Sequence, residues 1–247
     1  EPLMRSIDFY KKALALQKKY ANGKQIDNVI QTNGTLLTDE WCEFFAQNHW
    51  LVGISIDGPQ EYHDHYRVTP AGKPSWEKVM QGISLLKKHR VEWNAMAVVN
   101  AYNAEHPLEF YHFFRDNGCQ YLQFTPIVER LTEHEDGRTL ASLADDREIP
   151  LADASVTPAQ WGNFLCTIFD DWVRHDVGKM FVEIFDCTLA NWMGVLPGIC
   201  AYSKECGHAG VMEHNGDVYS CDHFVFPEYK LGNIREQSLI DMLYGEK

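Results

Sequence analysis

Three cysteines near the carboxyl-terminal end of the chain have a spacing that suits metal ligation. They form the pattern Cys200-x5-Cys206-x9-Gly216-x4-Cys221, in which an Asn-Gly pair ending at Gly216 predicts a hairpin turn that brings Cys206 and Cys221 together. Thiolates bind both zinc and iron–sulfur clusters. The spacing alone leaves three interpretations open with equal weight: an iron–sulfur cluster, a zinc ion completed by a histidine such as His208, and buried cysteines without a metal.

Polar side chains follow the predicted strands in the first half of the chain. They lie in segments 31–34 and 55–58, at Asn100, and in segment 123–129. In a parallel barrel the carboxyl ends of the strands build the active site, so these side chains predict a pocket at one rim. Asn-Gly and Asp-Gly pairs are also ordinary turn residues, and spacing alone slightly favours that second interpretation.

A run of titratable residues follows the second predicted strand. We expect His63-Asp64-His65 to form a solvated loop, because two imidazoles two positions apart cannot complete a metal shell without further nearby ligands. Arg67 in the same segment could hold an anionic ligand by a bidentate contact. Without such a ligand, Arg67 is expected to form a surface ion pair.

Apolar strands alternate with amphipathic helices over the first two thirds of the chain. Strands are predicted at 28–32, 51–56, 93–99, 121–128 and 181–185, and helices at 3–21, after Thr38, after Ser75, in the segment ending at 117, and after Thr157. Each strand–helix–strand connection joins parallel neighbours by a crossover. This order predicts a parallel barrel or part of one, with the polar segments at its rim.

Two segments depart from this alternation. Residues 129–156 are polar and acidic, and we expect them to be an exposed insertion that borders the rim. After Gly194, the residues Gly, Cys, His and Asn become frequent, and 211–219 predicts a hairpin. We therefore expect a first domain at 1–194 and a second, smaller domain at 195–247.

Composition excludes several classes of protein. The chain has 247 residues, 45% of them hydrophobic, which permits a sizeable core and excludes disordered, collagen-like and coiled-coil classes. The formal net charge of -13 disfavours nucleic acid and anionic membranes as partners. No apolar stretch approaches the ~18 residues of a membrane helix. The cysteine count of seven is odd and the first four cysteines have no regular spacing, which disfavours a disulfide framework and predicts a reducing, cytoplasmic location.

Further motifs add to the cysteine pattern. The chain begins with Glu1-Pro2, continues with Gln31-Thr-Asn-Gly34, and then has Ser55-Ile-Asp-Gly-Pro59 followed by His63-Asp64 and Arg67. In this order they resemble the motifs on the second, third and fourth strands of the radical S-adenosylmethionine barrel. Together with the cysteines, they make the whole chain resemble radical S-adenosylmethionine (radical SAM) enzymes that carry a SPASM auxiliary-cluster domain. The closest resemblance is to the anaerobic sulfatase-maturating enzymes.

The resemblance implies roles for three residues of the barrel. Ser55 and Arg67 would bind S-adenosylmethionine, Ser55 by a hydrogen bond and Arg67 through the carboxylate of the ligand. Val128 would pack on its adenine ring.

The resemblance also implies roles for four residues near the carboxyl-terminal end. Cys200, Cys206 and Cys221 would be three ligands of the first auxiliary [4Fe–4S] cluster. Asp222, next to the last of these, occupies the position of the catalytic base in the family. Without the resemblance, Asp222 is an ordinary solvated carboxylate of a hairpin.

The chain departs from the family pattern at both ends. It lacks the C-x3-C-x2-C motif, which binds the cluster that cleaves S-adenosylmethionine, and it lacks the C-x2-C-x5-C-x3-C group expected after 231–234. The chain therefore resembles an internal excerpt of a longer protein. On its own, it is expected to be inactive.

We expect an α/β fold, namely a partial (β/α)6-type radical SAM barrel lacking its first strands, followed by the start of a small SPASM domain. The function implied by the resemblance is the radical SAM-dependent oxidation of a sulfatase Cys or Ser to Cα-formylglycine. The alternatives are another radical modification of a peptide, such as a crosslink or an epimerisation, and a non-catalytic peptide-binding accessory protein.

The same resemblance implies cofactors and partners. The cofactors would be S-adenosylmethionine and [4Fe–4S] clusters. The partners would be a sulfatase-type polypeptide substrate and an electron donor such as flavodoxin or ferredoxin, with no nucleic acid and no membrane.

Overall fold

The chain forms two compact units. The computed structural model describes residues 1–134, 137–141, 147–205 and 209–245. The first unit consists of Glu1–Thr139 and Ile149–Asp186, and the second of Leu140–Glu148 and Cys187–Lys247. The predicted domain boundary before residue 195 stays a prediction. Among the described residues, no helix is both long enough and apolar enough to cross a membrane.

A five-stranded parallel sheet is the centre of the first unit. Its strands are β1 (Val29–Thr32), β2 (Leu51–Ser55), β3 (Trp93–Val99), β4 (Tyr121–Pro126) and β7 (Phe181–Val182). They lie side by side in the order β1-β2-β3-β4-β7, and every neighbouring pair is parallel. The strands alternate with helices along the chain, which confirms the predicted α/β arrangement.

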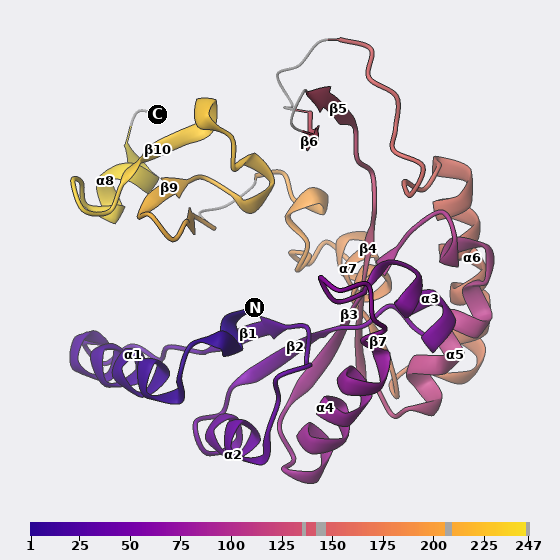
Figure 1. Ribbon diagram of the computed structural model, residues 1–247, viewed down its shortest axis with the longest axis horizontal. Coiled ribbons are helices and arrows are strands. Elements are labelled where there is room, and N and C mark those ends of the chain that lie inside the picture. Colours follow the sequence, from indigo (N-terminus) through magenta and orange to yellow (C-terminus); the bar gives the residue numbers. More distant parts are fainter. Residues whose placement is uncertain (135–136, 142–146, 206–208, 246–247) are drawn as a thin grey trace. The chain divides into compact units, whose positions relative to one another are not determined.

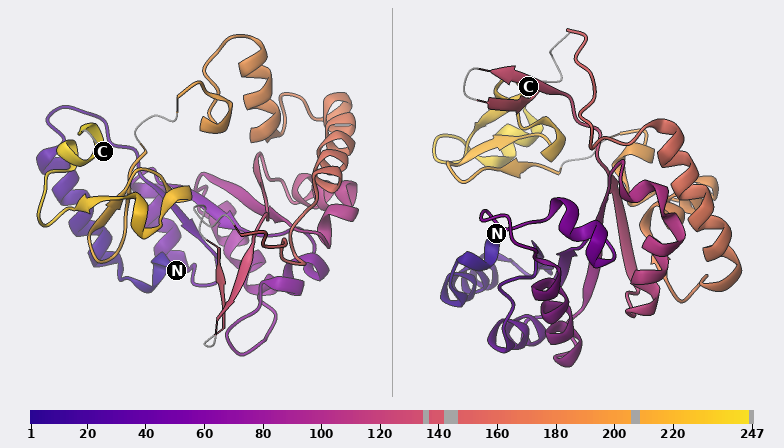
Figure 2. Two further views of the ribbon diagram at one scale, coloured as in Figure 1. Left: turned by 90° about the horizontal axis from the view of Figure 1, so that it is seen from above. Right: turned by 45° about the vertical axis from the view of Figure 1, so that its right-hand side comes forward.

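Helices cover the outer face of this sheet. The helices of this part of the chain are α1 (Ile7–Tyr20), α2 (Asp39–Gln47), α3 (Gln60–Tyr66), α4 (Trp76–Lys88), α5 (Pro107–Asp116) and α6 (Pro158–His175). Of these, α2, α4, α5 and α6 follow the convex side of the curved sheet (Figure 1), and the same layering is visible from the two further directions of Figure 2. All parallel strands end at one edge, so the residues after each strand share a rim.

Caps and apolar stripes explain where these helices form. The Thr38 hydroxyl accepts a hydrogen bond from the backbone N–H of Trp41 at the start of α2. Thr157 and Gln160 form the capping box predicted at the start of α6. The apolar stripes of the helices then bury side chains such as Phe45 and Phe164 in the core.

Two sequence predictions about local structure are wrong. Residues 63–65 lie in α3 and not in a solvated loop, and His63 is buried. The predicted strand 181–185 ends at Val182, because α7 (Glu183–Trp192) begins directly after it. A short apolar run such as Phe-Val-Glu-Ile-Phe fits a strand and a helix equally well, and here Phe185 packs against Trp172 of α6 with ring centroids 5.3 Å apart.

Backbone hydrogen bonds hold the two ends of the acidic segment 129–156 together. It contains the two paired strands β5 (Leu131–His134) and β6 (Gly137–Leu140). A bridge joins Arg130 to Leu151, and the backbone N–H of Val156 donates to the carbonyl of Ile127. Ser155 and Val156 are buried, whereas 135–136 and 142–146 lie outside the described residues.

The second unit is built on a small antiparallel sheet. Its strands are β8 (Val211–Met212), β9 (Asp217–Tyr219) and β10 (Lys230–Asn233), followed by α8 (Leu239–Tyr244). Strands β8 and β9 form the predicted hairpin. Gly216 adopts φ +91° in the turn, a conformation that favours glycine. The turn therefore fixes the direction in which the chain approaches Cys221.

Candidate functional site

The first part of the candidate site lies where β2 ends. Ser55 is the last residue of this strand and is almost completely buried at the carboxyl edge of the sheet. The side-chain amide of Gln31, from the neighbouring strand β1, donates to its hydroxyl over 3.4 Å. Residues at the carboxyl ends of two adjacent strands therefore contact each other, as the sequence predicts for a rim built by parallel strands.

Arg67 is bound by a buried carboxylate two residues beyond Ser55. Its Nε lies 2.6 Å from Asp57 Oδ2, and its Nη2 lies 3.1 Å from Asp57 Oδ1. The Asp57 side chain is only 4% exposed and that of Arg67 is 28% exposed, so this is a partly buried ion pair and not a surface pair. Among the described residues, Arg67 Nη1 has no hydrogen-bond partner. Asp57 therefore brings Arg67 to the end of β2 and leaves one edge of the guanidinium available to a ligand.

Glu1 is part of the same rim. One oxygen of its carboxylate accepts from the Thr32 hydroxyl over 2.7 Å, and the other accepts from the backbone N–H of Asn33 over 3.0 Å. These contacts hold the residues after β1 in place. Sequence analysis places Glu1 in a family motif but assigns it no role, because its contact with residues 31 positions away depends on the tertiary fold.

Val128 lies beyond the end of β4. The backbone N–H of the preceding residue, Ile127, donates to the carbonyl of Val99 at the end of β3. Val128 itself is 62% exposed, so its apolar surface is available to a flat apolar ligand. Ser55, Arg67 and Val128 all belong to the first unit, where Ser55 ends a strand of the parallel sheet and the other two lie beyond strand ends.

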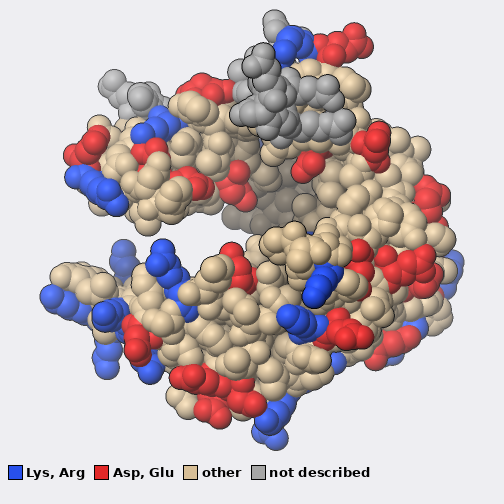
Figure 3. Space-filling view, viewed as in Figure 1, with Lys and Arg blue, Asp and Glu red and all other residues tan. Residues whose placement is uncertain are grey.

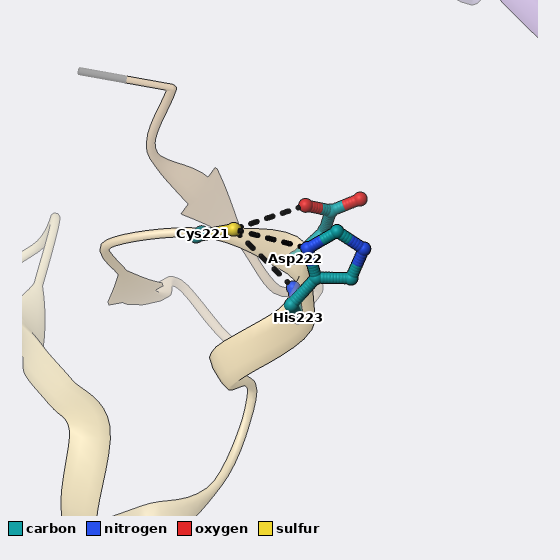
Figure 4. Close-up of side chains that lie close together, drawn as sticks. All are labelled: Cys221, Asp222 and His223. Atoms are coloured by element: carbon teal, nitrogen blue, oxygen red, sulfur yellow. Dashed lines mark hydrogen bonds between the residues drawn. The ribbon is translucent and has the colours of Figure 1, made fainter. Parts of the chain in front are cut away.

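The second part of the candidate site lies after the hairpin of the second unit. Cys221 directly precedes the short 3-10 helix Asp222–Phe224. Its sulfur lies 3.2 Å from Asp222 Oδ1, 3.4 Å from the backbone nitrogen of His223 and 3.8 Å from His223 Nδ1 (Figure 4). The segment after the hairpin thus holds one thiol, one carboxylate and one imidazole close together.

Cys200 lies close enough to Cys221 for their charges to interact. The backbone N–H of His223 favours the Cys221 thiolate, but desolvation and the negative charges of Asp222 and Cys200 outweigh it, so the pKa of Cys221 is raised. Cys200 is exposed, and both thiols are free. Cys206 lies outside the described residues. Free thiols are suitable ligands for a soft metal centre.

Asp222 is exposed and ionised. The hydrogen bond from the Cys221 thiol, with a smaller contribution from the charge of His223, holds the pKa of Asp222 below its ordinary value. An ionised carboxylate can accept a proton from a bound substrate.

Geometry alone does not separate an iron–sulfur cluster from zinc. The ligand atoms of Cys221, Asp222 and His223 lie within 4.8 Å of one another, as a zinc site would also require. The histidine that the sequence favours for zinc, His208, lies outside the described residues.

Comparisons with known proteins resolve the class of the chain. A sequence model of the radical SAM superfamily matches residues 1–114, and one of the SPASM iron-sulfur cluster-binding domain matches residues 204–247. The chain therefore combines part of a radical SAM domain with part of a SPASM domain, which confirms the expected resemblance and fold class.

The chain is similar over its whole length to the anaerobic sulfatase-maturating enzymes. It is 70% identical to a serine-type anaerobic sulfatase-maturating enzyme of Bacteroides thetaiotaomicron, over 100% of this chain and 60% of the relative. It is 34% identical to a cysteine-type enzyme of Clostridium novyi, over 98% of this chain and 62% of the relative. The chain thus spans about 60% of the length of the curated relatives it matches.

Solved structures agree with the sequence comparisons. The fold matches that of native anSMEcpe with bound AdoMet, with a TM-score of 0.85 and 29% identity, over 98% of this chain and 63% of that chain. It also matches anSMEcpe with bound AdoMet and the Cp18Cys peptide, with a TM-score of 0.85 and 29% identity, over 98% of this chain and 64% of that one.

Proposed function

We propose that the protein containing this chain uses S-adenosylmethionine to oxidise a sulfatase side chain to Cα-formylglycine. The observation that carries this proposal is the 70% identity to a serine-type anaerobic sulfatase-maturating enzyme. The similarity extends over all 247 residues of the chain. Cysteine-type relatives from Clostridium novyi and from two strains of Clostridium perfringens are only 34%, 31% and 32% identical. We therefore infer that the residue oxidised is serine.

S-adenosylmethionine would bind at the rim of the first unit. When reduced by an iron–sulfur cluster, it supplies the oxidising equivalent that removes a hydrogen atom from the substrate. Arg67 would hold its carboxylate through the free edge of the guanidinium, and Ser55 would supply a hydrogen bond. Val128 would cover the adenine ring with its exposed apolar side chain.

An auxiliary [4Fe–4S] cluster would be held in the second unit by Cys200, Cys206 and Cys221. Oxidation of a serine to an aldehyde removes one hydrogen atom, one proton and one further electron. Asp222 would accept the proton of the substrate hydroxyl at its carboxylate, and the neighbouring cluster would take the electron.

The partners follow from this reaction. The substrate would be a sulfatase polypeptide, and a small electron donor such as flavodoxin or ferredoxin would supply reducing equivalents in the cytoplasm.

The chain carries 35 acidic and 22 basic residues, so it offers no general attraction for polyanions. On the face drawn in Figure 3, Lys and Arg gather over α1, whose sequence contains Lys11, Lys12, Lys18 and Lys19.

Substitution of Asp222 tests the proposed chemistry in the full-length, reconstituted protein. Asp222→Asn keeps the shape of the side chain but removes its basicity, so formylglycine formation should fall about 10²–10⁴-fold while S-adenosylmethionine is still cleaved. Glu213→Gln changes an acidic residue of the hairpin that precedes Asp222; it is the matched control and should leave both reactions unchanged. Normal formylglycine formation by Asp222→Asn would contradict the assignment of the base.

A further inference from the structure

Four residues around the end of β2 form a closed ring of hydrogen bonds. The backbone N–H of Asp57 donates to His63 Nδ1 over 3.2 Å, and His63 Nε2 lies 3.0 Å from the Ser75 hydroxyl. The Ser75 hydroxyl donates to the carbonyl oxygen of Arg67 over 2.6 Å. The guanidinium of Arg67 donates to the Asp57 carboxylate and completes the ring.

The direction of every bond in the ring is determined. His63 Nδ1 must accept, because its partner is a backbone N–H, so the imidazole carries its proton on Nε2. Nε2 then donates to Ser75, whose single proton goes to the carbonyl of Arg67. The ring exists only with a neutral histidine, since a proton on Nδ1 would face the Asp57 N–H.

Burial keeps the ring in this state. Asp57 and His63 are 3% and 1% exposed. Desolvation lowers the pKa of His63 to about 4, so the imidazole is neutral at physiological pH. Asp57 Oδ1 also accepts from the backbone N–H of Val98, which ties the ring to β3.

The α4 side of the ring is fixed as well. Ser75 occupies the N-cap position of α4, yet its hydroxyl makes no capping bond and is used in the ring. Asp64 supplies the cap instead, since its Oδ1 accepts from the backbone N–H of Ser75 and of Trp76. Arg67 is thus held at both its backbone and its guanidinium.

We propose that Asp57, His63 and Ser75 are positioning residues that hold Arg67 in the one orientation in which its free edge meets the carboxylate of S-adenosylmethionine. This inference rests on the proposed function. Because Asp57 neutralises the charge of Arg67, attraction by net charge is weak, and recognition of the ligand depends on the direction of the remaining N–H groups. A ring that loses one member would leave Arg67 in place but less precisely aimed.

The test compares two ligands that differ only in the group that Arg67 would hold. Dissociation constants are measured for S-adenosylmethionine and for its decarboxylated analogue with the full-length, reconstituted protein. Ser75→Ala and Asp57→Asn should each weaken binding of S-adenosylmethionine by about tenfold, equivalent to about 1.4 kcal/mol, and leave binding of the analogue unchanged. Ser75→Thr keeps the hydroxyl and should restore binding.

A serine elsewhere on α4 provides the matched control. Ser84 is exposed and its hydroxyl bonds only the Met80 carbonyl of its own helix, so Ser84→Ala should change neither constant. An equal loss for both ligands, or no loss in either variant, would contradict the positioning role. Thermal unfolding shows whether each variant is folded. If Ser75→Ala does not fold, the comparison of the two ligands is made with Asp57→Asn. If the unmodified protein fails to bind S-adenosylmethionine at all, the proposed function is wrong and the inference is wrong with it.

Discussion

At the scale of single residues, the neutral state of His63 has a measurable consequence for stability. Its pKa in the folded protein is about 4, below the ordinary value of 6.5, so the unfolded chain binds the additional proton as the pH falls from 6.5 towards 4. The contribution of neutral His63 to the free energy of unfolding is therefore complete above pH 6.5 and decreases as the pH falls towards 4. Between pH 7 and pH 5 the free energy of unfolding should fall by roughly 2 kcal/mol from this residue.

Urea unfolding at the two pH values measures this contribution. His63→Gln should be less stable than the unmodified protein at pH 7 but should lose less stability on acidification. His49 is exposed, and His49→Asn is a suitable control because asparagine tolerates the positive φ of 55° at this position. The same pH dependence in His63→Gln and in the unmodified protein would show that His63 is not the group responsible.

The residues of the candidate site differ in how far the sequence predicts them. The sequence marks Arg67 as an anion-binding residue, but it does not predict the pairing with Asp57 or the ring through His63. These contacts depend on α3, whose formation the local sequence pattern does not predict. The run His63-Asp64-His65 has no apolar residue that would mark it as a helix. Burial of His63 follows from tertiary contacts with Asp57 and Ser75.

At the scale of elements, one close contact fixes α4 against the residues after β1. A Cβ atom on Gly82 would lie 2.5 Å from the carbonyl oxygen of Gly34 and 3.0 Å from Leu37. Gly82→Ala should therefore destabilise the protein by about 1–3 kcal/mol, since neither backbone can move freely. Because Gly34 ends the 31–34 motif, the substitution should also disturb the rim.

A second helical glycine provides the control for this prediction. Gly162 lies in α6, and a Cβ atom there would have no neighbour within 4 Å. Gly162→Ala should stabilise the protein by about 0.5–1 kcal/mol through helix propensity alone. Chemical denaturation of both variants measures these opposite effects, and a stable Gly82→Ala protein would contradict the close packing.

Most elements follow from the sequence, and the exceptions have physical reasons. The strands at 51–55 and 93–99 and the capping box at Thr157 combine strong apolar patterns with clear start signals. The segment after Val182 has an apolar pattern too short to distinguish a strand from a helix, and contact of Phe185 with α6 decides for the helix.

At the scale of the whole molecule, the two units have cores of very different size. Among the described residues of the second unit, the buried apolar side chains are Cys187, Val218, Tyr219 and Met242. A core this small gives little stability on its own, so the second unit should depend on the proposed [4Fe–4S] cluster for its stability. The sheet and helices of the first unit contain many more buried side chains, so the first unit should be stable without that cluster.

Hydrogen exchange of the full-length, reconstituted protein measures this difference. Cys221→Ala should lose iron and increase exchange in residues 209–245, while the strands of the parallel sheet keep their protection. Cys166→Ala removes an exposed free thiol of the first unit and should change neither iron content nor exchange. Unchanged iron in Cys221→Ala, or an equal rise in exchange in both units, would contradict the assignment of the cluster to the second unit.

Formylglycine formation on a peptide substrate is the direct test of the proposed reaction. The full-length, reconstituted protein is incubated anaerobically with S-adenosylmethionine, a reductant and a serine-containing sulfatase peptide, and the peptide is analysed by mass spectrometry and with a hydrazide probe. The account predicts that the peptide loses two hydrogen atoms and gains an aldehyde that forms a hydrazone, whereas a peptide with alanine at that position does not react. The same mass loss without an aldehyde would indicate a crosslink, and an unchanged mass would indicate epimerisation or no reaction. Either result would contradict the account.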